Sequence, residues 1–182
     1  LRSLLIEDGN RLILIDNGIG NKQGEKFFSH YYLHGTDSLD NSLAKNGFHR
    51  NDITDVILTH LHFDHCGGSI EREGERLVPA FKKATFWSNE KHWQWATQPN
   101  EREKASFLKE NILPIRESGQ LKMIPAGESD SSKLSSAYFS DSLSIRFVNG
   151  HTEKMMLPQV NYNGQTIVFV ADLLPSVAHL PI

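Results

Sequence analysis

The sequence of 182 residues has little cysteine, little excess charge and no long apolar run. Cys66 is the single cysteine, so these residues cannot form an intrachain disulfide, and we expect a cytoplasmic protein. The net charge of −3 argues against a nucleic-acid partner, because proteins that bind phosphate backbones usually carry a basic surplus. No apolar run approaches the roughly 20 residues that span a bilayer, so we expect no membrane partner.

Composition is ordinary for a globular protein, with 38% hydrophobic and 23% charged residues. We expect residues 1–182 to form one domain. The sequence begins at Leu1 rather than Met and ends on apolar residues, so we expect this domain to be truncated at both ends.

Apolar runs and turn residues predict alternating strands and helices. Helical patterns cover 39–46 and about 88–118, with helix starts near residues 89 and 100, and Pro114 should break or kink the second helix of that stretch. The Ser/Asp/Gly-rich stretch 127–136 is expected to be a surface loop. Strands are expected at 3–6, 12–15, 56–58, 84–87, 121–124, 143–148, 156–162 and 165–171. This order predicts an α/β sandwich with mixed sheets.

Four potential metal ligands lie within six residues, directly after the apolar run 56–58. They are His60, His62, Asp64 and His65. Alternate side chains of an extended segment point the same way, so His60 and His62 can bind one ion together. Beyond them the chain must turn, which lets Asp64 and His65 face a second ion. A solvated histidine-rich turn is the alternative, but four potential ligands at this spacing favour a metal site.

Two further candidates follow later predicted strands. His151 comes after 143–148, and Asp172 comes after 165–171. An acidic residue that closes an apolar strand is poorly placed for a core and well placed for a cleft. Taken alone, His151 could be a turn residue and Asp172 a cap. Beside the cluster at 60–65, we interpret both as ligands.

Several segments together resemble the metallo-β-lactamase superfamily. Residues 59–68, THLHFDHCGG, resemble its HxHxDH motif, and residues 150–152 resemble its third-histidine motif. Residues 171–172 resemble its bridging aspartate, and residues 14–18 its early Asp-x-Gly turn. The resemblance covers essentially the whole chain. It implies an αββα metallo-β-lactamase sandwich with metals at one edge.

The resemblance also implies a ligand set for two divalent metal ions. Zinc is the expected metal, and iron and manganese are the alternatives. The first ion would be held by His60, His62 and His151, the second by Asp64 and His65, with Asp172 bridging them and Asp16 supporting the motif loop. The family usually supplies one more histidine to the second ion. His179 follows the bridging aspartate by only seven residues, and we expect the true ligand beyond Ile182.

Within the superfamily, the chain looks closest to the lactonase and methyl-parathion-hydrolase-like branch. The reasons are Leu61 and Phe63 in the motif, the long helical insert at about 88–120, and the stretch 172–176. One departure is clear. The best-known acyl-homoserine lactonases carry a tyrosine shortly after the bridging aspartate, where residues 174–175 are Leu-Pro here.

The function that this resemblance implies is metal-dependent hydrolysis. A hydroxide bridging the two ions would attack a lactone or related ester, with phosphotriesters as further substrates, and Asp64 would carry a proton to the leaving group. No protein nucleophile is needed, so we expect Cys66 to be a packed residue. The sequence does not determine the oligomeric state, and a homodimer is one possibility.

Other members of the superfamily provide the alternatives. A glyoxalase II-like thioesterase would need a basic site for glutathione, and a phosphodiesterase or nuclease would need a basic surface. A di-iron redox protein would normally be joined to a flavin domain.

Aromatic residues are frequent in the expected insert and near the N-terminus. Those around the insert are Phe86, Trp87, His92, Trp93, Trp95 and Phe107, and those near the N-terminus are Phe27, Phe28, Tyr31 and Tyr32. We favour an amphipathic cover packed on the sandwich for the insert. The alternative is that some of these rings wall an apolar substrate pocket.

Overall fold

The computed structural model describes residues 2–126 and 139–180, and in these residues it contains three sheets. A mixed five-stranded sheet has the order β1 (Leu4–Asp8), β2 (Arg11–Ile15), β3 (Asp55–Ile57), β6 (Thr85–Ser88) and β7 (Leu121–Met123). Only β1 is antiparallel to its neighbour. An antiparallel sheet has the order β10 (Gln165–Val168), β9 (Met155–Tyr162) and β8 (Leu143–Val148). A separate hairpin joins β4 (Ile70–Glu73) to β5 (Arg76–Pro79).

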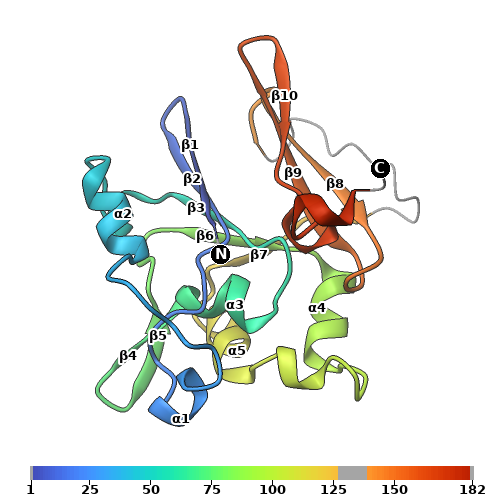
Figure 1. Ribbon diagram of the computed structural model, residues 1–182. Coiled ribbons are helices and arrows are strands. Elements are labelled where there is room, and N and C mark those ends of the chain that lie inside the picture. The colour runs from blue at the N-terminus through green and yellow to red at the C-terminus, as the bar shows by residue number, and fades with distance from the viewer. Residues whose placement is uncertain (1, 127–138, 181–182) are drawn as a thin grey trace.

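The helices lie mainly on one side of the five-stranded sheet. They are α1 (Glu25–Phe28), α2 (Leu39–Lys45), α3 (Phe63–Cys66), α4 (Glu90–Thr97) and α5 (Lys109–Glu117). In Figure 1, α3, α4 and α5 lie below this sheet, and β8–β10 lie above it. The described residues thus supply one helical and two sheet layers, and the predicted α/β sandwich class with mixed sheets is confirmed. Within the same ranges, no helix has the length and apolar character needed to cross a bilayer.

Strand β2 is buried on both faces and divides the core in two. Leu12 and Leu14 pack with the helical side, in a cluster that includes Phe86. Ile13 and Ile15 point the other way and pack against the second sheet. Each such buried side chain contributes about 1.5–3 kcal/mol. Burial on both faces explains why β2 is a continuous apolar run rather than an alternating one.

Local signals in the sequence set several element boundaries. The Ser38 side chain accepts the Asn41 N–H and begins α2, and the Asn89 side chain accepts the His92 N–H and begins α4. Between β9 and β10, Asn163 and Gly164 both have positive φ, 50° and 74°. Two such residues make the tight turn expected for this dipeptide, so the predicted hairpin is confirmed.

Two predictions for the helical segment, a helix break at Pro114 and a helix start near residue 100, were wrong. Pro114 lies inside α5 and does not end it, because the flanking Ile112 and Ile115 are buried in the core and hold the helix in place. No long helix begins at Asn100. Its side chain instead accepts the Glu103 N–H within a turn that leads to the short 3-10 helix Lys104–Ser106.

Further differences concern the later strands and one hairpin. Strand β10 ends at Val168 rather than at residue 171, because the chain enters the 3-10 turn Ala171–Leu173. The β4–β5 hairpin was not expected, because its charged residues show no apolar alternation. The loop expected at 127–136 lies outside the described residues.

Candidate metal centre

The histidine motif lies where β3 leads into a single helical turn. The chain is still extended at His62, with φ −65° and ψ 147°, and then turns into α3. The N–H groups of His65 and Cys66 donate to the His62 carbonyl oxygen at 3.0 and 3.1 Å. This change of direction brings the His65 ring beside His60, with ring centroids 4.1 Å apart.

Asp16 supports the motif from the end of β2. Its Oδ1 accepts the Thr59 N–H, and its Oδ2 accepts both the Thr59 hydroxyl and His65 Nδ1–H, each at 2.8 Å. Asp16 itself has a φ of 54°, a region that non-glycine residues rarely adopt. The bond to Nδ1 leaves Nε2 of His65 free to face a ligand.

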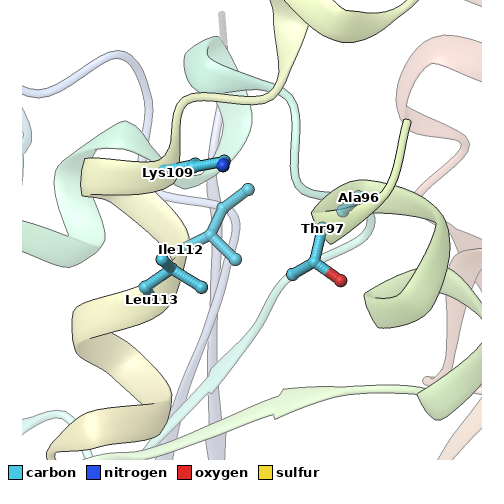
Figure 2. Close-up of a pocket in the computed structure, with 5 residues that line it drawn as sticks. All are labelled: Ala96, Thr97, Lys109, Ile112 and Leu113. Carbon is cyan, nitrogen blue, oxygen red and sulfur yellow. The ribbon is translucent and has the colours of Figure 1, made fainter. Parts of the chain in front are cut away.

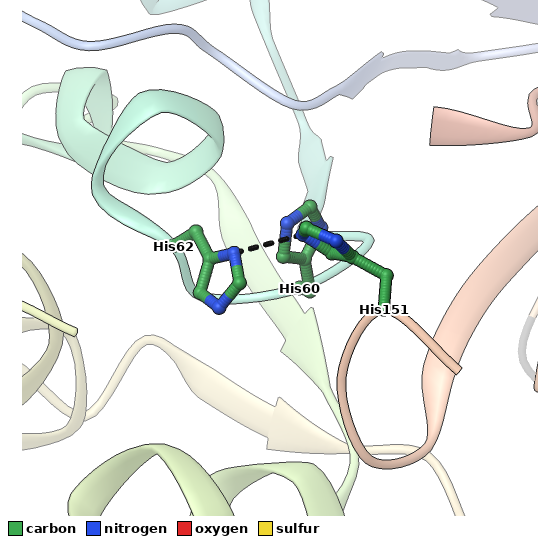
Figure 3. Close-up of side chains that lie close together, drawn as sticks. All are labelled: His60, His62 and His151. Carbon is green, nitrogen blue, oxygen red and sulfur yellow. Dashed lines mark hydrogen bonds between the residues drawn. The ribbon is translucent and has the colours of Figure 1, made fainter. Parts of the chain in front are cut away.

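Five of the expected ligands meet in two overlapping groups. Ligand atoms of His60, His62 and His151 lie within 4.8 Å of one another, and those of His60, His65 and Asp172 form the second group. Figure 3 shows the first group, in which His151 approaches the motif loop from the other side and its Nε2 lies 3.0 Å from His62 Nδ1. Asp172 faces both groups, because its two oxygens lie 3.2 Å from His65 Nε2 and 3.4 Å from His151 Nε2.

Two other candidates lie outside both groups. An Asp64 oxygen is 3.7 Å from His65 Nε2, and its side chain is 30% exposed at the margin of the site. His179 is exposed, and its Nδ1 lies 2.9 Å from Ser176 Oγ.

The donor atoms fit a divalent cation. The Thr59 hydroxyl donates to Asp16, so it can only accept from His60 Nδ1–H, 3.1 Å away. The remaining Nε2 of His60 is buried and has no hydrogen-bond partner among the described residues. Leaving such an atom unpaired costs about 1–3 kcal/mol, which a bound ion would recover. Neutral imidazoles beside a carboxylate suit first-row metals such as zinc.

The pKa values of the candidate ligands are set by burial and by neighbouring groups. Burial, followed by the nearby His151, lowers the pKa of His62 to about 4, and burial also lowers the pKa of His60 well below its ordinary value. Burial alone would lower the pKa of His65 too. Hydrogen bonds with Asp16 and Asp172 outweigh it and raise that pKa to about 10. A cation at the site would take the place of the His65 proton.

His92, which the sequence did not single out as a site residue, braces the centre from α4. Its ring is completely buried. Nε2 accepts the N–H of Leu61 at 2.9 Å, and Nδ1 donates to the carbonyl oxygen of Glu153 at 2.6 Å. His92 thereby ties the motif loop to the loop that carries His151.

Acid is expected to destabilise the metal-free protein through His92. Burial, only partly offset by the bond to the Glu153 carbonyl, lowers the pKa of His92 from 6.5 to about 4. Between these values the unfolded chain binds the proton and the folded chain does not, so stability falls as the pH drops. The raised pKa of His65 adds no change here, because its contribution is fully present below pH 6.5.

We therefore expect the free energy of unfolding to fall by roughly 2 kcal/mol between pH 6.5 and 5 from His92 alone. Urea unfolding with a chelator present measures it. Stability that is constant or rises over this range would contradict the expectation.

The aromatic residues divide into core and site. Phe86, Trp87 and Trp93 are buried in the two cores. Trp93 lies on α4 and packs as expected for a helical cover, whereas Phe86 and Trp87 belong to strand β6 of the sheet. Phe107 packs on the His62 ring, with centroids 4.6 Å apart. A cavity of about 110 Å³ lies between α4 and α5, lined by Ala96, Thr97, Lys109, Ile112 and Leu113 (Figure 2). It is smaller than the roughly 300–1,000 Å³ of typical ligand pockets.

A second aromatic group lies beside the motif. Phe27 of α1 and Tyr31 pack against Phe63, with ring centroids 5.4 and 5.1 Å apart. Phe27 also packs against Phe28. Phe63 stands between His62 and Asp64 in the chain, so these rings lie next to candidate ligands.

The chain resembles known proteins in sequence and in fold. The family described as the metallo-beta-lactamase superfamily matches residues 2–181. No curated protein matches the chain. A probable metal-dependent hydrolase from Staphylococcus aureus has a similar structure, with a TM-score of 0.80 and 24% identity. The dizinc quorum-quenching lactonase AidC, in complex with a product, has a TM-score of 0.69 and 22% identity. A quorum-quenching N-acyl homoserine lactone lactonase has a TM-score of 0.64 and 21% identity.

These three structures share the fold with this chain. They match 97%, 94% and 92% of it, in the same order. The chain in turn spans 59%, 56% and 59% of their lengths.

Proposed function

Since the chain belongs to the metallo-beta-lactamase superfamily, we propose that the full protein is a binuclear metal-dependent hydrolase that acts on lactones or related esters. The observation that carries this proposal is the meeting of four histidines and Asp172 in two groups that share His60. We also propose that residues 1–182 belong to one domain with a helical insert at about 88–120.

The chemistry divides between ions and side chains. Bound divalent ions would polarise a carbonyl or phosphoryl oxygen and lower the pKa of water from 15.7 toward about 7. Asp172 faces both groups, which supports a bridging role. Asp64 lies at the partly exposed margin, where its carboxylate can orient water and return a proton to the leaving group.

The surroundings of the ligands support a substrate with an apolar part. Phe27, Tyr31 and Phe63 form an aromatic wall beside the motif. Such a wall suits the acyl or aryl group of a lactone or ester and offers little to a polyanion. The similar lactonase structures, one of them holding its product, favour the same class.

A substrate panel tests the proposal on the full-length, zinc-loaded protein. The panel contains an acyl-homoserine lactone, an aryl ester, a phosphotriester, a thioester and a phosphodiester. We expect hydrolysis of the lactone or the aryl ester, loss of activity with a chelator, and recovery with zinc. Activity confined to the thioester or phosphodiester, no activity, or activity that survives metal removal would contradict the proposal. So would redox-active iron with an attached flavin.

A further inference from the structure

The two ring nitrogens of His62 have different surroundings. Nδ1 lies 3.0 Å from Nε2 of His151, on the side of the other ligands. Nε2 points away, is buried, and has no hydrogen-bond partner among the described residues. The closest carboxylate oxygen with which Nε2 forms an ion-pair contact is Oε2 of Glu103, 3.9 Å away.

The Glu103 carboxylate is held firmly. Its Oε2 accepts Trp95 Nε1–H and the Thr152 hydroxyl, both at 2.9 Å, and its Oε1 accepts from Asn100 Nδ2 at 3.2 Å. The side chain is only 17% exposed. A charged group is costly to bury, and Trp95, Thr152 and Asn100 offset that cost without explaining why the carboxylate faces a histidine.

We propose that Glu103 is a positioning residue that accepts a hydrogen bond from His62 Nε2–H and so presents Nδ1 to the first metal position. This inference rests on the metal site proposed above. A ligating histidine commonly donates its other N–H to a carboxylate, which sets the tautomer and makes the ligating nitrogen more basic. The 3.9 Å separation exceeds a charge-assisted hydrogen bond by about 1 Å, so a small ring movement closes it.

The same carboxylate also reaches the other side of the site. Thr152, whose hydroxyl donates to Glu103, directly follows His151 in the chain. Glu103 therefore connects the loop of one ligand to the ring of another, from a segment that contributes no ligand itself. This arrangement makes the turn between α4 and α5 part of the metal centre rather than a surface connection.

The variant Glu103→Gln tests the inference, with Glu101→Gln as the matched control. Glu101 lies two residues away, its side chain is 90% exposed, and it pairs with Lys104 at 3.5 Å. Zinc dissociation constants are measured by chelator competition on the full-length protein, together with the visible spectrum of the Co²⁺ form. We expect zinc binding about 10–100-fold weaker and an altered Co²⁺ spectrum for Glu103→Gln, and no change for the control.

A purely structural role would give a different result. It would lower the melting temperature of the metal-free protein and leave zinc affinity unchanged, which would overturn the inference. Thr152→Val removes one hydrogen bond to Glu103 at nearly constant side-chain shape, so it serves as the test if Glu103→Gln fails to fold. We expect Thr152→Val to bind zinc more weakly than the wild-type protein. Zinc binding equal to that of the wild-type protein would overturn the inference. If the wild-type protein binds no zinc, the proposed function fails. If the wild-type protein binds zinc and Glu103→Gln binds it equally tightly, only the inference about Glu103 fails.

Discussion

His60→Ala in the full-length protein is expected to reduce kcat/KM by at least about a thousandfold. His60 is the one residue common to both ligand groups, and it is fully buried. Its Nε2, which has no hydrogen-bond partner among the described residues, is expected to bind the first ion, so the substitution removes one of the three histidines of that position. Lewis-acid stabilisation by a metal is worth several kcal/mol, and each 1.36 kcal/mol is a factor of about ten in rate. Steady-state kinetics and metal content measured on the same sample test this.

The matched control for this variant is His30→Ala. His30 is exposed and follows α1, and it belongs to neither ligand group. We expect wild-type activity and metal content for it. A His60→Ala protein that keeps full metal content and activity would show that His60 is not a metal ligand.

Gly67→Ala is expected to destabilise the protein by about 3 kcal/mol and to disturb the metal centre. The added Cβ would clash with the backbone carbonyl of Ile19, which cannot move as a flexible side chain would. The φ of Gly67 is −60°, an ordinary value, so the cost comes from close approach alone. The Gly67 carbonyl also accepts the buried Lys22 Nζ, so movement here breaks a second contact. Urea unfolding measures the loss.

Gly24→Ala is the control for Gly67→Ala. A Cβ at Gly24 meets nothing within 4 Å, and the φ of Gly24 is −76°. We expect a change in the free energy of unfolding below about 1 kcal/mol, the scale of an N-cap substitution. Equal losses of unfolding free energy in the two variants would show that the close approach of the Ile19 backbone is not the reason why position 67 requires glycine.

The candidate ligands were predictable because their signal is local. His60, His62 and His65 lie within six residues at the end of an apolar run, where the change from strand to turn is visible in the sequence. His151 and Asp172 stand out as polar residues that follow apolar runs. Parallel and antiparallel strands then bring these ends together, which is what the structure shows for both ligand groups.

The residues that brace the ligands were not predictable in the same way. His92 bonds to residues 31 and 61 positions away, and Glu103 bonds to Thr152 at a separation of 49. In the sequence, Glu103 looks like an ordinary polar residue of a helical segment, and His92 stands only among the aromatic residues of the insert. Only the packing of α4 and the following turn against the motif loop gives them partners.

Predictions of individual elements were wrong where tertiary packing outweighed the local conformational preference of a residue. Pro114 lacks an N–H and is expected to end a helix, yet the buried Ile112 and Ile115 on either side keep α5 continuous. Asn100 is a good helix cap by type, but its side chain closes only a turn. A helix-propensity cost of about 1–3 kcal/mol is smaller than the free energy gained by burying two isoleucine side chains.

A zinc titration of the full-length protein, freed of metal by a chelator, tests the central claim most directly. In the proposed two-metal centre, two neighbouring cation positions are formed with the help of His60, His62, His65, His151 and Asp172. We predict tight binding of two zinc ions per chain in the wild-type protein. Binding of one ion or none would contradict the two-metal centre.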